Sequence, residues 1–334
     1  MLLPERPTTP ALLDRFGRLH DYLRVSVTDR CNFRCVYCLP EDGTTWLPRD
    51  GVLHYEEIVR VVRVLAPMGL RRVRLTGGEP TIRRDIEALV AGIAAVPGIT
   101  DLTMTTNAHR FATQAAALKT AGLRRVNISI DSLDPARFAA ITRGGDLHAV
   151  LAGIDAAVDA GLLPVKLNMV VMGGQNDDEV VSMARWALER APAVQLRFIE
   201  YMPFDQRLHA GVPAAELRRR LEEAFGALVP VRERQGGGPA THWQLDPLVV
   251  GFIAPITEHF CASCNRLRLL ADGHLRTCLA HEDTPSLRDV LRAGTSDDEL
   301  GTLLRKIVRG KPAGHQAELD GGTAFEGVMT QIGG

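Results

Sequence analysis

Long apolar runs and an excess of charge of either sign are missing from this chain of 334 residues. No segment approaches the roughly 20 apolar residues of a membrane helix. The proline-containing start, with an early Glu5, is not typical of a signal peptide. The net charge of −1 argues against nucleic acid or a membrane surface as a partner. We therefore expect a cytoplasmic protein, in a reducing compartment where cysteines serve metal binding or catalysis rather than disulfides.

A fourth cysteine is missing from each of two cysteine clusters. Six cysteines stand in two sets of three, one with C-x3-C-x2-C and one with C-x2-C-x13-C spacing: Cys31, Cys35 and Cys38, and Cys261, Cys264 and Cys278. Structural zinc sites and electron-transfer iron–sulfur clusters use four protein ligands. Three thiolates leave one metal position open for a small molecule, so the two triads predict two open metal sites. The alternative for the first triad is three buried or zinc-binding cysteines.

Strand-like and helix-like patterns alternate between residues 23 and 200. This alternation indicates βαβ units and a parallel sheet, in an incomplete (β/α) barrel or alternatively a doubly wound sheet. The predicted strands are Leu23–Thr28, Arg72–Thr76, Asp101–Thr106, Arg125–Ile130, Pro164–Val171 and Val194–Ile199. The predicted helices are Glu56–Leu65, Asp85–Ala95, Phe111–Ala121, Ala149–Ala160 and Asp177–Arg190.

Polar side chains occupy every second position of these predicted strands. The apolar set, such as Val25, Val73 and Ile128, is expected to meet the helices, because successive strand residues point to opposite faces. The polar set is expected to line a common, mostly basic interior that suits an anionic ligand. It comprises Arg24, Ser26, Thr28, Arg72, Arg74, Thr76, Thr103, Thr105, Asn127, Ser129, Asp131, Lys166, Asn168, Gln195 and Arg197. The alternative is an antiparallel sheet with one solvated face, which the intervening helices disfavour.

The pattern changes after about residue 205, and we predict two domains, 1–205 and 206–334. Residues 232–240 are glycine-rich and predict a loop or hairpin tip. Asp272–Gly273 predicts a turn that would fold Cys278 back towards Cys264. Strands are predicted at Leu248–Ile253, Arg266–Leu270 and His274–Cys278, and helix within Pro285–Val308.

Two groups of motifs resemble known families. The first cysteine triad, followed by Gly77-Gly78-Glu79-Pro80 at the end of the second predicted strand, resembles the radical S-adenosylmethionine superfamily. Residues 260–268 (FCASCNRLR) and 273–279 (GHLRTCL), with the terminal Gly333-Gly334, are similar to the GTP 3′,8-cyclase family of molybdenum cofactor biosynthesis. The resemblance implies an α/β fold, an incomplete (β/α)6 TIM-like barrel with a C-terminal α+β domain closing its open side.

The resemblance also implies cofactors and site residues. Each triad would hold a 4Fe–4S cluster, and S-adenosylmethionine would bind the open iron of the first. Tyr37, Gly78, Ser129 and Met202 match positions that bind S-adenosylmethionine. Arg24, Arg74, Thr105, Lys166, Arg266, Leu267 and Arg268 match positions that bind GTP. The implied catalytic residues are Arg266, Arg268, Gly333 and Gly334.

The implied reaction starts with a 5′-deoxyadenosyl radical that removes the ribose C3′ hydrogen of GTP. The C3′ radical then attacks guanine C8 and gives (8S)-3′,8-cyclo-7,8-dihydroguanosine 5′-triphosphate. The family further implies a homodimer, an external one-electron reductant, and a cyclic pyranopterin monophosphate synthase that receives the product. Two alternatives stay open: another radical S-adenosylmethionine enzyme with an auxiliary cluster, such as a peptide maturase, or a non-enzymatic iron–sulfur or zinc protein.

Overall fold

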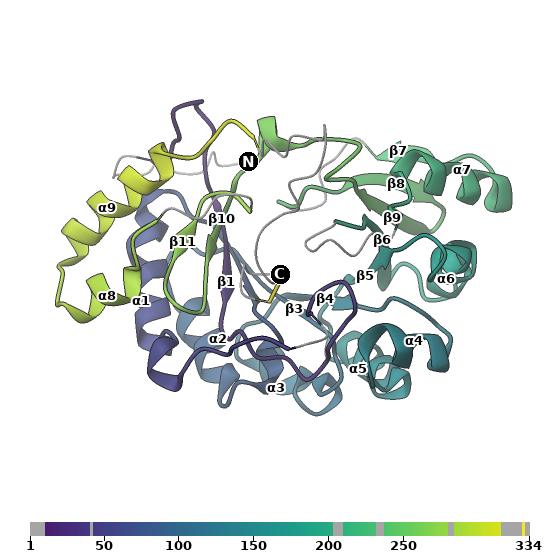
Figure 1. The fold of residues 1–334 in the computed structure, drawn as a ribbon, viewed down its shortest axis with the longest axis horizontal. Helices are drawn as coiled ribbons and strands as arrows, with labels where there is room; N and C mark the ends of the chain where they lie inside the picture. The colour runs from purple at the N-terminus through teal and green to yellow at the C-terminus, as the bar shows by residue number, and fades with distance from the viewer. Residues whose placement is uncertain are drawn as a thin grey trace.

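The central sheet has the parallel βα architecture that the alternating pattern predicts. The computed structural model describes residues 11–40, 43–202, 210–231, 237–279, 284–314 and 329–330. Within these ranges, 11 strands form a sheet in the order β11-β10-β1-β2-β3-β4-β5-β6-β9-β8-β7. Its middle is the parallel unit β1 (Tyr22–Ser26), β2 (Arg72–Thr76), β3 (Asp101–Thr106), β4 (Arg125–Ser129), β5 (Val165–Val171) and β6 (Val194–Glu200). The helices lie along the outside of this curved sheet (Figure 1), as in an incomplete barrel rather than a doubly wound sheet.

The helices follow the strands in the expected order, with two additions, 135–142 and 214–225. They are α1 (Tyr55–Leu65), α2 (Ile86–Ala94), α3 (Ala115–Thr120), α4 (Pro135–Thr142), α5 (Leu147–Asp159), α6 (Val180–Leu188) and α7 (Ala214–Phe225). The alternating pattern does not predict α4. This short helix begins at Pro135 behind an Asp134 cap, whose side chain accepts from the Arg137 N–H. A helix of eight residues has too short a periodic pattern to be recognised, and its cap is then the main signal in the sequence.

The two faces of the parallel strands differ as their alternation predicts. The apolar residues pack against the helices, and the exposed fraction is 0% for Val25, Val73, Met104, Ile128, Leu167 and Leu196. The strand register sets polar residues side by side on the other face. Arg24 pairs with both Arg74 and Arg268, and Asn168 pairs with Arg197. The barrel interior is therefore a continuous polar surface.

The C-terminal part of the chain adds strands to both edges of this parallel unit. β9 (Leu248–Ile253) runs parallel to β6, and β10 (Arg266–Leu269) runs parallel to β1. β8 (Thr241–Leu245) and β7 (Val229–Val231) continue the sheet beyond β9 in antiparallel fashion. β11 (Leu275–Arg276) pairs antiparallel with β10, which is the predicted hairpin. The predicted boundary near residue 205 thus marks a change of sequence pattern that the sheet itself crosses.

The predicted helical segment Pro285–Val308 is two helices, α8 (Leu287–Arg292) and α9 (Asp297–Arg309). Gly294, with a left-handed φ of 81°, interrupts it. Ser296 then caps α9 in a capping box with Glu299. Local turn chemistry therefore overrides the helical periodicity here.

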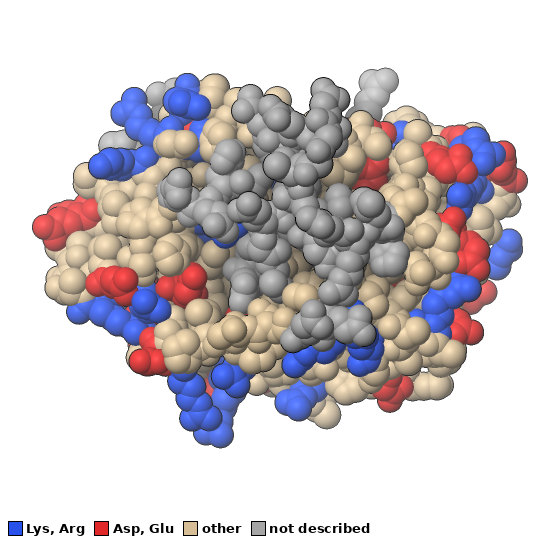
Figure 2. Space-filling model, viewed as in Figure 1, with Lys and Arg blue, Asp and Glu red and all other residues tan. Residues whose placement is uncertain are grey.

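The surface shows no dominant charge on the described part of the face in Figure 2, where acidic and basic side chains are interspersed around the rim. This agrees with the net charge of −1. Among the helices of the described ranges, none is both long enough and apolar enough to cross a membrane.

Candidate active site

The carboxyl ends of the parallel strands and both cysteine triads line one cavity. Its volume is about 350 Å³, within the range of roughly 300–1,000 Å³ that is usual for small-molecule sites. All six cysteines line it, together with residues at the ends of β2 to β6. Two triads more than 200 residues apart in sequence thus face the same space.

The first cysteine triad lies on the loop after β1, and α4 supports this loop from one side. The backbone N–H groups of Arg34 and Val36 donate to the carbonyl oxygens of Thr142 and Ile141 at 3.0 and 2.9 Å. Burial raises the pKa of the Cys31 thiol to about 11 and that of Cys38 to about 12. A metal is therefore needed to keep these buried sulfurs as thiolates.

The paired glycines of the Gly77-Gly78-Glu79-Pro80 segment support the cysteine loop from the other side. Gly78 N–H donates to the Thr28 carbonyl at 2.7 Å. A Cβ on Gly77 would lie 2.4 Å from the Thr28 oxygen, and one on Gly78 would lie 2.2 Å from the Arg30 oxygen. The glycines therefore permit close contact between two backbone segments.

Glu79 of the same segment joins the loop after β2 to the loop after β3. Its buried carboxylate accepts from Thr81 Oγ1 and Thr106 Oγ1, both at 2.6 Å, and from the Asn107 N–H at 2.7 Å. Burial raises the pKa of Glu79, while these donors oppose the shift. The sequence indicates Glu79 only as part of a motif, because its structural role depends on the positions of Thr106 and Asn107 in the fold.

The four residues matched to S-adenosylmethionine binding, Tyr37, Gly78, Ser129 and Met202, all line the cavity. The Tyr37 hydroxyl donates to Asp131 Oδ2 at 2.7 Å. The Val170 N–H donates to the other carboxylate oxygen of Asp131 at 2.9 Å. Burial raises the pKa of Asp131 to about 6, even though both donors act to lower it. Asp131 is a site residue that the matched positions missed, although strand parity placed it on the inner face.

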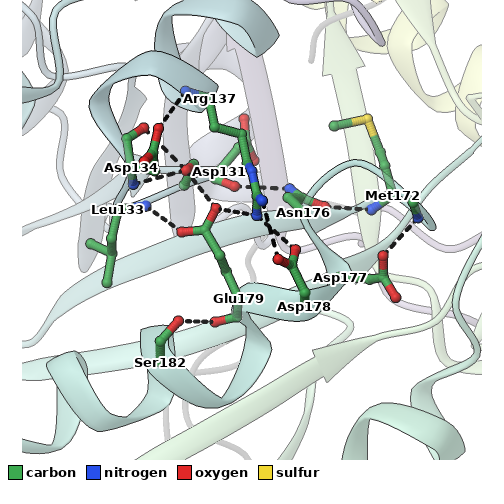
Figure 3. Close-up of polar contacts among 12 residues, drawn as sticks. Asp131, Leu133, Asp134, Arg137, Met172, Asn176, Asp177, Asp178, Glu179 and Ser182 are labelled. Atoms are coloured by element: carbon green, nitrogen blue, oxygen red, sulfur yellow. Dashed lines mark hydrogen bonds and ion pairs between the residues drawn. The ribbon is translucent and has the colours of Figure 1, made fainter.

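A polar network behind Asp131 fixes the loops that follow β4 and β5 (Figure 3). Asn176 donates to the Asp131 and Val170 carbonyl oxygens at 2.8 and 2.9 Å. Glu179 accepts from the Leu133 N–H and from Arg137 Nη1, both at 2.8 Å. These side chains are far apart in sequence, so no single motif indicates the network.

A basic group, buried at Arg197 and half-buried at its other members, lines the part of the cavity between the strands. Arg24, Arg74, Arg197, Arg266 and Arg268 belong to it, with Thr105 at the end of β3. Burial, with the nearby Arg74, lowers the pKa of Arg197 to about 9. Burial, with the nearby Arg266, lowers that of Arg268 to about 10. An anion in the cavity would relieve this mutual repulsion.

Two of the residues matched to GTP binding do not line this cavity. Lys166 lies on the polar strand face beside Asn127 and Gln195 but outside the lining, and it is 4% exposed. Leu267 is on the opposite face, 0% exposed within the hydrophobic core. Since Leu267 alternates with Arg266 and Arg268 along β10, its side chain cannot face a ligand there, and only its backbone remains for a contact.

Several buried polar atoms of the cavity wall lack a hydrogen-bond partner among the described residues. They are Tyr22 Oη, Thr105 Oγ1, Asn127 Nδ2, Asn168 Oδ1 and Arg197 Nε and Nη2. Buried polar groups are rarely left unpaired in folded proteins. The wall therefore suits a polar ligand with both donors and acceptors.

The second triad is assembled by the β10–β11 hairpin. Cys261 and Cys264 lie just before β10, and Cys278 lies just after β11. Burial acts to raise the pKa of Cys264, but the neighbouring Arg266 and Lys311 lower it to about 7.

The donor set of each triad suits an iron–sulfur cluster. All six cysteines are free of disulfides, and cysteine thiolates are the usual ligands of 4Fe–4S clusters. In such a cluster each thiolate binds its own iron, so three thiolates leave one iron open.

The end of the chain also reaches this cavity. Met329 and Thr330 line it, and Thr330 is 2% exposed. Gly333 and Gly334 themselves lie outside the described residues.

Comparisons with known proteins agree with this geometry. The family model described as "Radical SAM superfamily" matches residues 25–187, and that described as "Molybdenum Cofactor Synthesis C" matches residues 194–317. The fold and the first cysteine loop thus define the class of protein, a radical S-adenosylmethionine protein.

Sequence relatives narrow the class to one family. The GTP 3′,8-cyclase of Listeria monocytogenes serotype 4b is 44% identical over 97% of this chain and 99% of its own length. That of Pelotomaculum thermopropionicum is 46% identical over 96% of this chain and 99% of its own length. The chain belongs to the GTP 3′,8-cyclase family.

Solved structures share the fold at low sequence identity. Streptococcus suis SuiB bound to S-adenosylmethionine gives a TM-score of 0.60 at 16% identity, over 89% of this chain and 69% of that chain. SuiB bound to the precursor peptide SuiA gives 0.61 at 14% identity, over 89% and 68%. This likeness concerns the fold alone.

Proposed function

We propose that this chain is a lyase that cyclises GTP to (8S)-3′,8-cyclo-7,8-dihydroguanosine 5′-triphosphate, the first step of molybdenum cofactor (molybdopterin) biosynthesis. The observation that carries the proposal is that both cysteine triads and the basic strand face line one cavity. Its cofactors are S-adenosylmethionine and two 4Fe–4S clusters. When bound, the first cluster and S-adenosylmethionine supply the 5′-deoxyadenosyl radical that removes the ribose C3′ hydrogen.

In this proposal the first triad, Cys31, Cys35 and Cys38, holds the cluster that binds S-adenosylmethionine. Tyr37, Gly78, Ser129 and Met202 contact the cofactor, a role supported by their place on the cavity wall. The Tyr37 ring packs against the adenine, and its hydrogen bond to Asp131 restricts the ring to one orientation. Asp131 is thus a positioning residue for the cofactor.

The second triad, Cys261, Cys264 and Cys278, holds the cluster that binds the guanine. Arg24, Arg74, Thr105, Lys166, Arg266 and Arg268 bind the rest of GTP, and Leu267 contributes through its backbone. Guanidinium groups bind phosphate oxygens in a bidentate manner, and an ammonium acts as a point charge. A triphosphate would stabilise the charged forms of these crowded cations, which is the electrostatic support for placing it here.

The partners follow from the same proposal. GTP is the substrate, an external one-electron reductant supplies the electron, and a cyclic pyranopterin monophosphate synthase receives the product. The chain acts as a homodimer. Gly333 and Gly334 act in the active site, which the position of Met329 and Thr330 on the cavity wall supports.

The decisive experiment measures metal and product together. Anaerobically reconstituted protein should carry about eight irons per chain, four in each cluster. With a reductant, GTP and S-adenosylmethionine, mass spectrometry should detect 5′-deoxyadenosine and a cyclised nucleotide in equal amounts. Zinc in place of iron, or 5′-deoxyadenosine without a nucleotide product, would contradict the proposal; the second result would favour a peptide maturase.

A variant pair separates the roles of the two triads. Cys261→Ser should still cleave S-adenosylmethionine when reduced but should form no cyclised nucleotide. Cys35→Ser should do neither, because the first cluster is lost. Full cyclisation by Cys261→Ser would refute the substrate role of the second triad.

A further inference from the structure

Lys311 follows α9 and lies beside the second cysteine triad, where it is 2% exposed. Its Nζ donates to Cys264 Sγ at 3.5 Å, to the Arg266 carbonyl at 2.7 Å and to the Thr277 carbonyl at 2.5 Å. An ammonium has three donors. The three protein acceptors therefore satisfy it fully, and they fix the charge at this place.

The three acceptors of Lys311 come from separate segments of the second site. Cys264 lies in the loop before β10, Arg266 begins β10, and Thr277 directly precedes Cys278. One side chain thus joins the segments that carry Cys264 and Cys278.

Arg18 makes the corresponding connection for the remaining cysteine. Its guanidinium donates to the Cys261 carbonyl at 2.8 Å and to the Ala313 carbonyl at 2.7 Å, two residues after Lys311. Residues 311–314 are therefore connected to the chain segments that carry all three cysteines. Lys311 contacts two of these segments directly, and Arg18 connects the third. Gly314 belongs to the same contact, because a Cβ there would lie 3.3 Å from the Cys261 Cβ.

A buried cation that donates to a ligand sulfur acts on the metal that the sulfur binds. The reduction potential of an iron–sulfur cluster depends on net charge, on hydrogen bonds to its sulfurs and on exposure. Partners of the ligands also set ligand orientation and metal affinity. Arg266 Nη2 also approaches Cys264 Sγ, at 3.7 Å, but in the proposed function Arg266 binds substrate. Lys311 gives all its donors to the protein.

We infer that Lys311 is a positioning residue of the second cluster, which holds its ligand segments together and raises its reduction potential. This inference rests on the proposed 4Fe–4S cluster at Cys261, Cys264 and Cys278. A cation beside the cluster favours the state that carries one more electron, so removing the charge lowers the potential.

The test uses a triple variant of the full chain, Cys31→Ser, Cys35→Ser and Cys38→Ser, which retains only the second cluster and serves as the parent. In this parent, Lys311→Met removes the positive charge but keeps a side chain of similar length. Lys311→Arg keeps the charge. Lys306→Met is the matched control, because Lys306 is an exposed lysine on the neighbouring helix α9. Iron content, chelator-driven iron loss and an anaerobic redox titration followed by electron paramagnetic resonance are measured on each, with circular dichroism as the check of folding.

Lys311→Met should release iron faster than the parent and shift the midpoint potential of its remaining cluster downwards. Lys311→Arg should retain a potential near that of the parent, and Lys306→Met should match the parent in both measurements. An unchanged potential in Lys311→Met would overturn the electrostatic role, and an unchanged rate of iron loss would overturn the positioning role. A parent without iron would instead overturn the cluster assignment, and the inference with it.

Discussion

Single residues of the polar strand face combine burial with like charge. Lys166 illustrates the effect: burial and then the nearby Arg197, Arg125 and Arg74 lower the pKa of its ammonium to about 7. The ordinary value is 10.5. Near neutral pH the side chain is therefore partly deprotonated until an anion arrives. In the proposed function a triphosphate close to Lys166 would raise this pKa again, so binding would take up a proton.

The first prediction concerns the pH dependence of GTP binding. Between about pH 7 and 8 a terminal phosphate is largely ionised, since its second pKa is about 6. Arg197, whose pKa is about 9, is still charged there, so Lys166 dominates the proton uptake. Affinity should fall as the pH rises through this window, by up to tenfold per unit for one proton. Calorimetry in buffers of different ionisation enthalpy measures the uptake directly.

Lys166→Met should remove this proton uptake as well as weaken GTP binding, with a smaller effect on S-adenosylmethionine binding. Lys119→Met is the control, because Lys119 is an exposed lysine in α3. Equal proton uptake in wild type and Lys166→Met would place Lys166 away from the triphosphate.

The second prediction concerns Gly78, whose need for glycine is steric. Its added Cβ would lie 2.2 Å from the Arg30 carbonyl oxygen, and backbone cannot move aside cheaply. Gly78→Ala should lower the free energy of unfolding by about 1–3 kcal/mol and reduce iron at the first triad. Thermal unfolding and iron analysis check both effects.

Gly211→Ala is the matched control, because the new Cβ would lie at an ordinary contact distance of 3.7 Å from the Tyr201 carbonyl oxygen. If Gly78→Ala kept the stability and iron content of Gly211→Ala, the close contact between the two loops would be refuted.

At the scale of elements, the β10–β11 hairpin determines whether the second triad can form. Gly273 makes its turn with a φ of 94°, and a Cβ there would lie 2.6 Å from the Arg288 Cβ at the start of α8. The turn therefore has two reasons for glycine: its left-handed backbone and its contact with α8.

The third prediction compares Gly273→Ala with Gly294→Ala. Both glycines have positive φ, but a Cβ on Gly294 would meet nothing within 4 Å. Gly294→Ala should therefore show only the backbone strain, about 1–2 kcal/mol, with normal iron content. Gly273→Ala should be less stable than Gly294→Ala and should lose iron at the second triad, while the first triad keeps its own. Equal stability and equal iron in the two variants would rule out a special role for this turn.

Most elements could be predicted from the sequence, because each parallel strand is an alternating run bounded by turn residues. β2 and β3 match the predicted bounds, and the other four differ by one or two residues at their ends. The predicted helices do not include α4 or α7. The glycine-rich segment 232–240 predicts a loop or hairpin tip between β7 and β8, but not the two strands themselves. β7 and β8 are short and partly exposed, so burial imposes no strong pattern on them.

At the scale of the whole molecule, the cavity depends on segments from both ends of the chain. Because β10 pairs with β1, the second triad lies next to the first strand of the barrel. Met329 and Thr330, close to the C-terminus, also line the cavity. The Thr330 backbone N–H acts to lower the pKa of Cys38, against burial, which raises it to about 12. The C-terminal end thus contacts the first triad as well.

The fourth prediction removes the last two residues. Deleting Gly333 and Gly334 should abolish GTP cyclisation while both clusters keep their iron, because neither glycine is a cluster ligand in the proposed function. Iron analysis and product detection on the same sample separate the two effects. An unaffected rate of cyclisation would show that the terminal residues are dispensable.

The sequence by itself determined the two open cysteine triads, the parallel βα unit and the polar inner face of its strands. These follow from local spacing and from the period of two along a strand, which do not depend on distant partners. Only the tertiary structure decided that β10 pairs with β1, and so that Arg268 lies beside Arg24 in the wall of one cavity. It also decided that Leu267 faces the core, that Asp131 holds Tyr37 and that Lys311 contacts Cys264. Such contacts join residues that lie far apart along the chain, and their geometry is fixed by the packing of the whole sheet rather than by any local pattern.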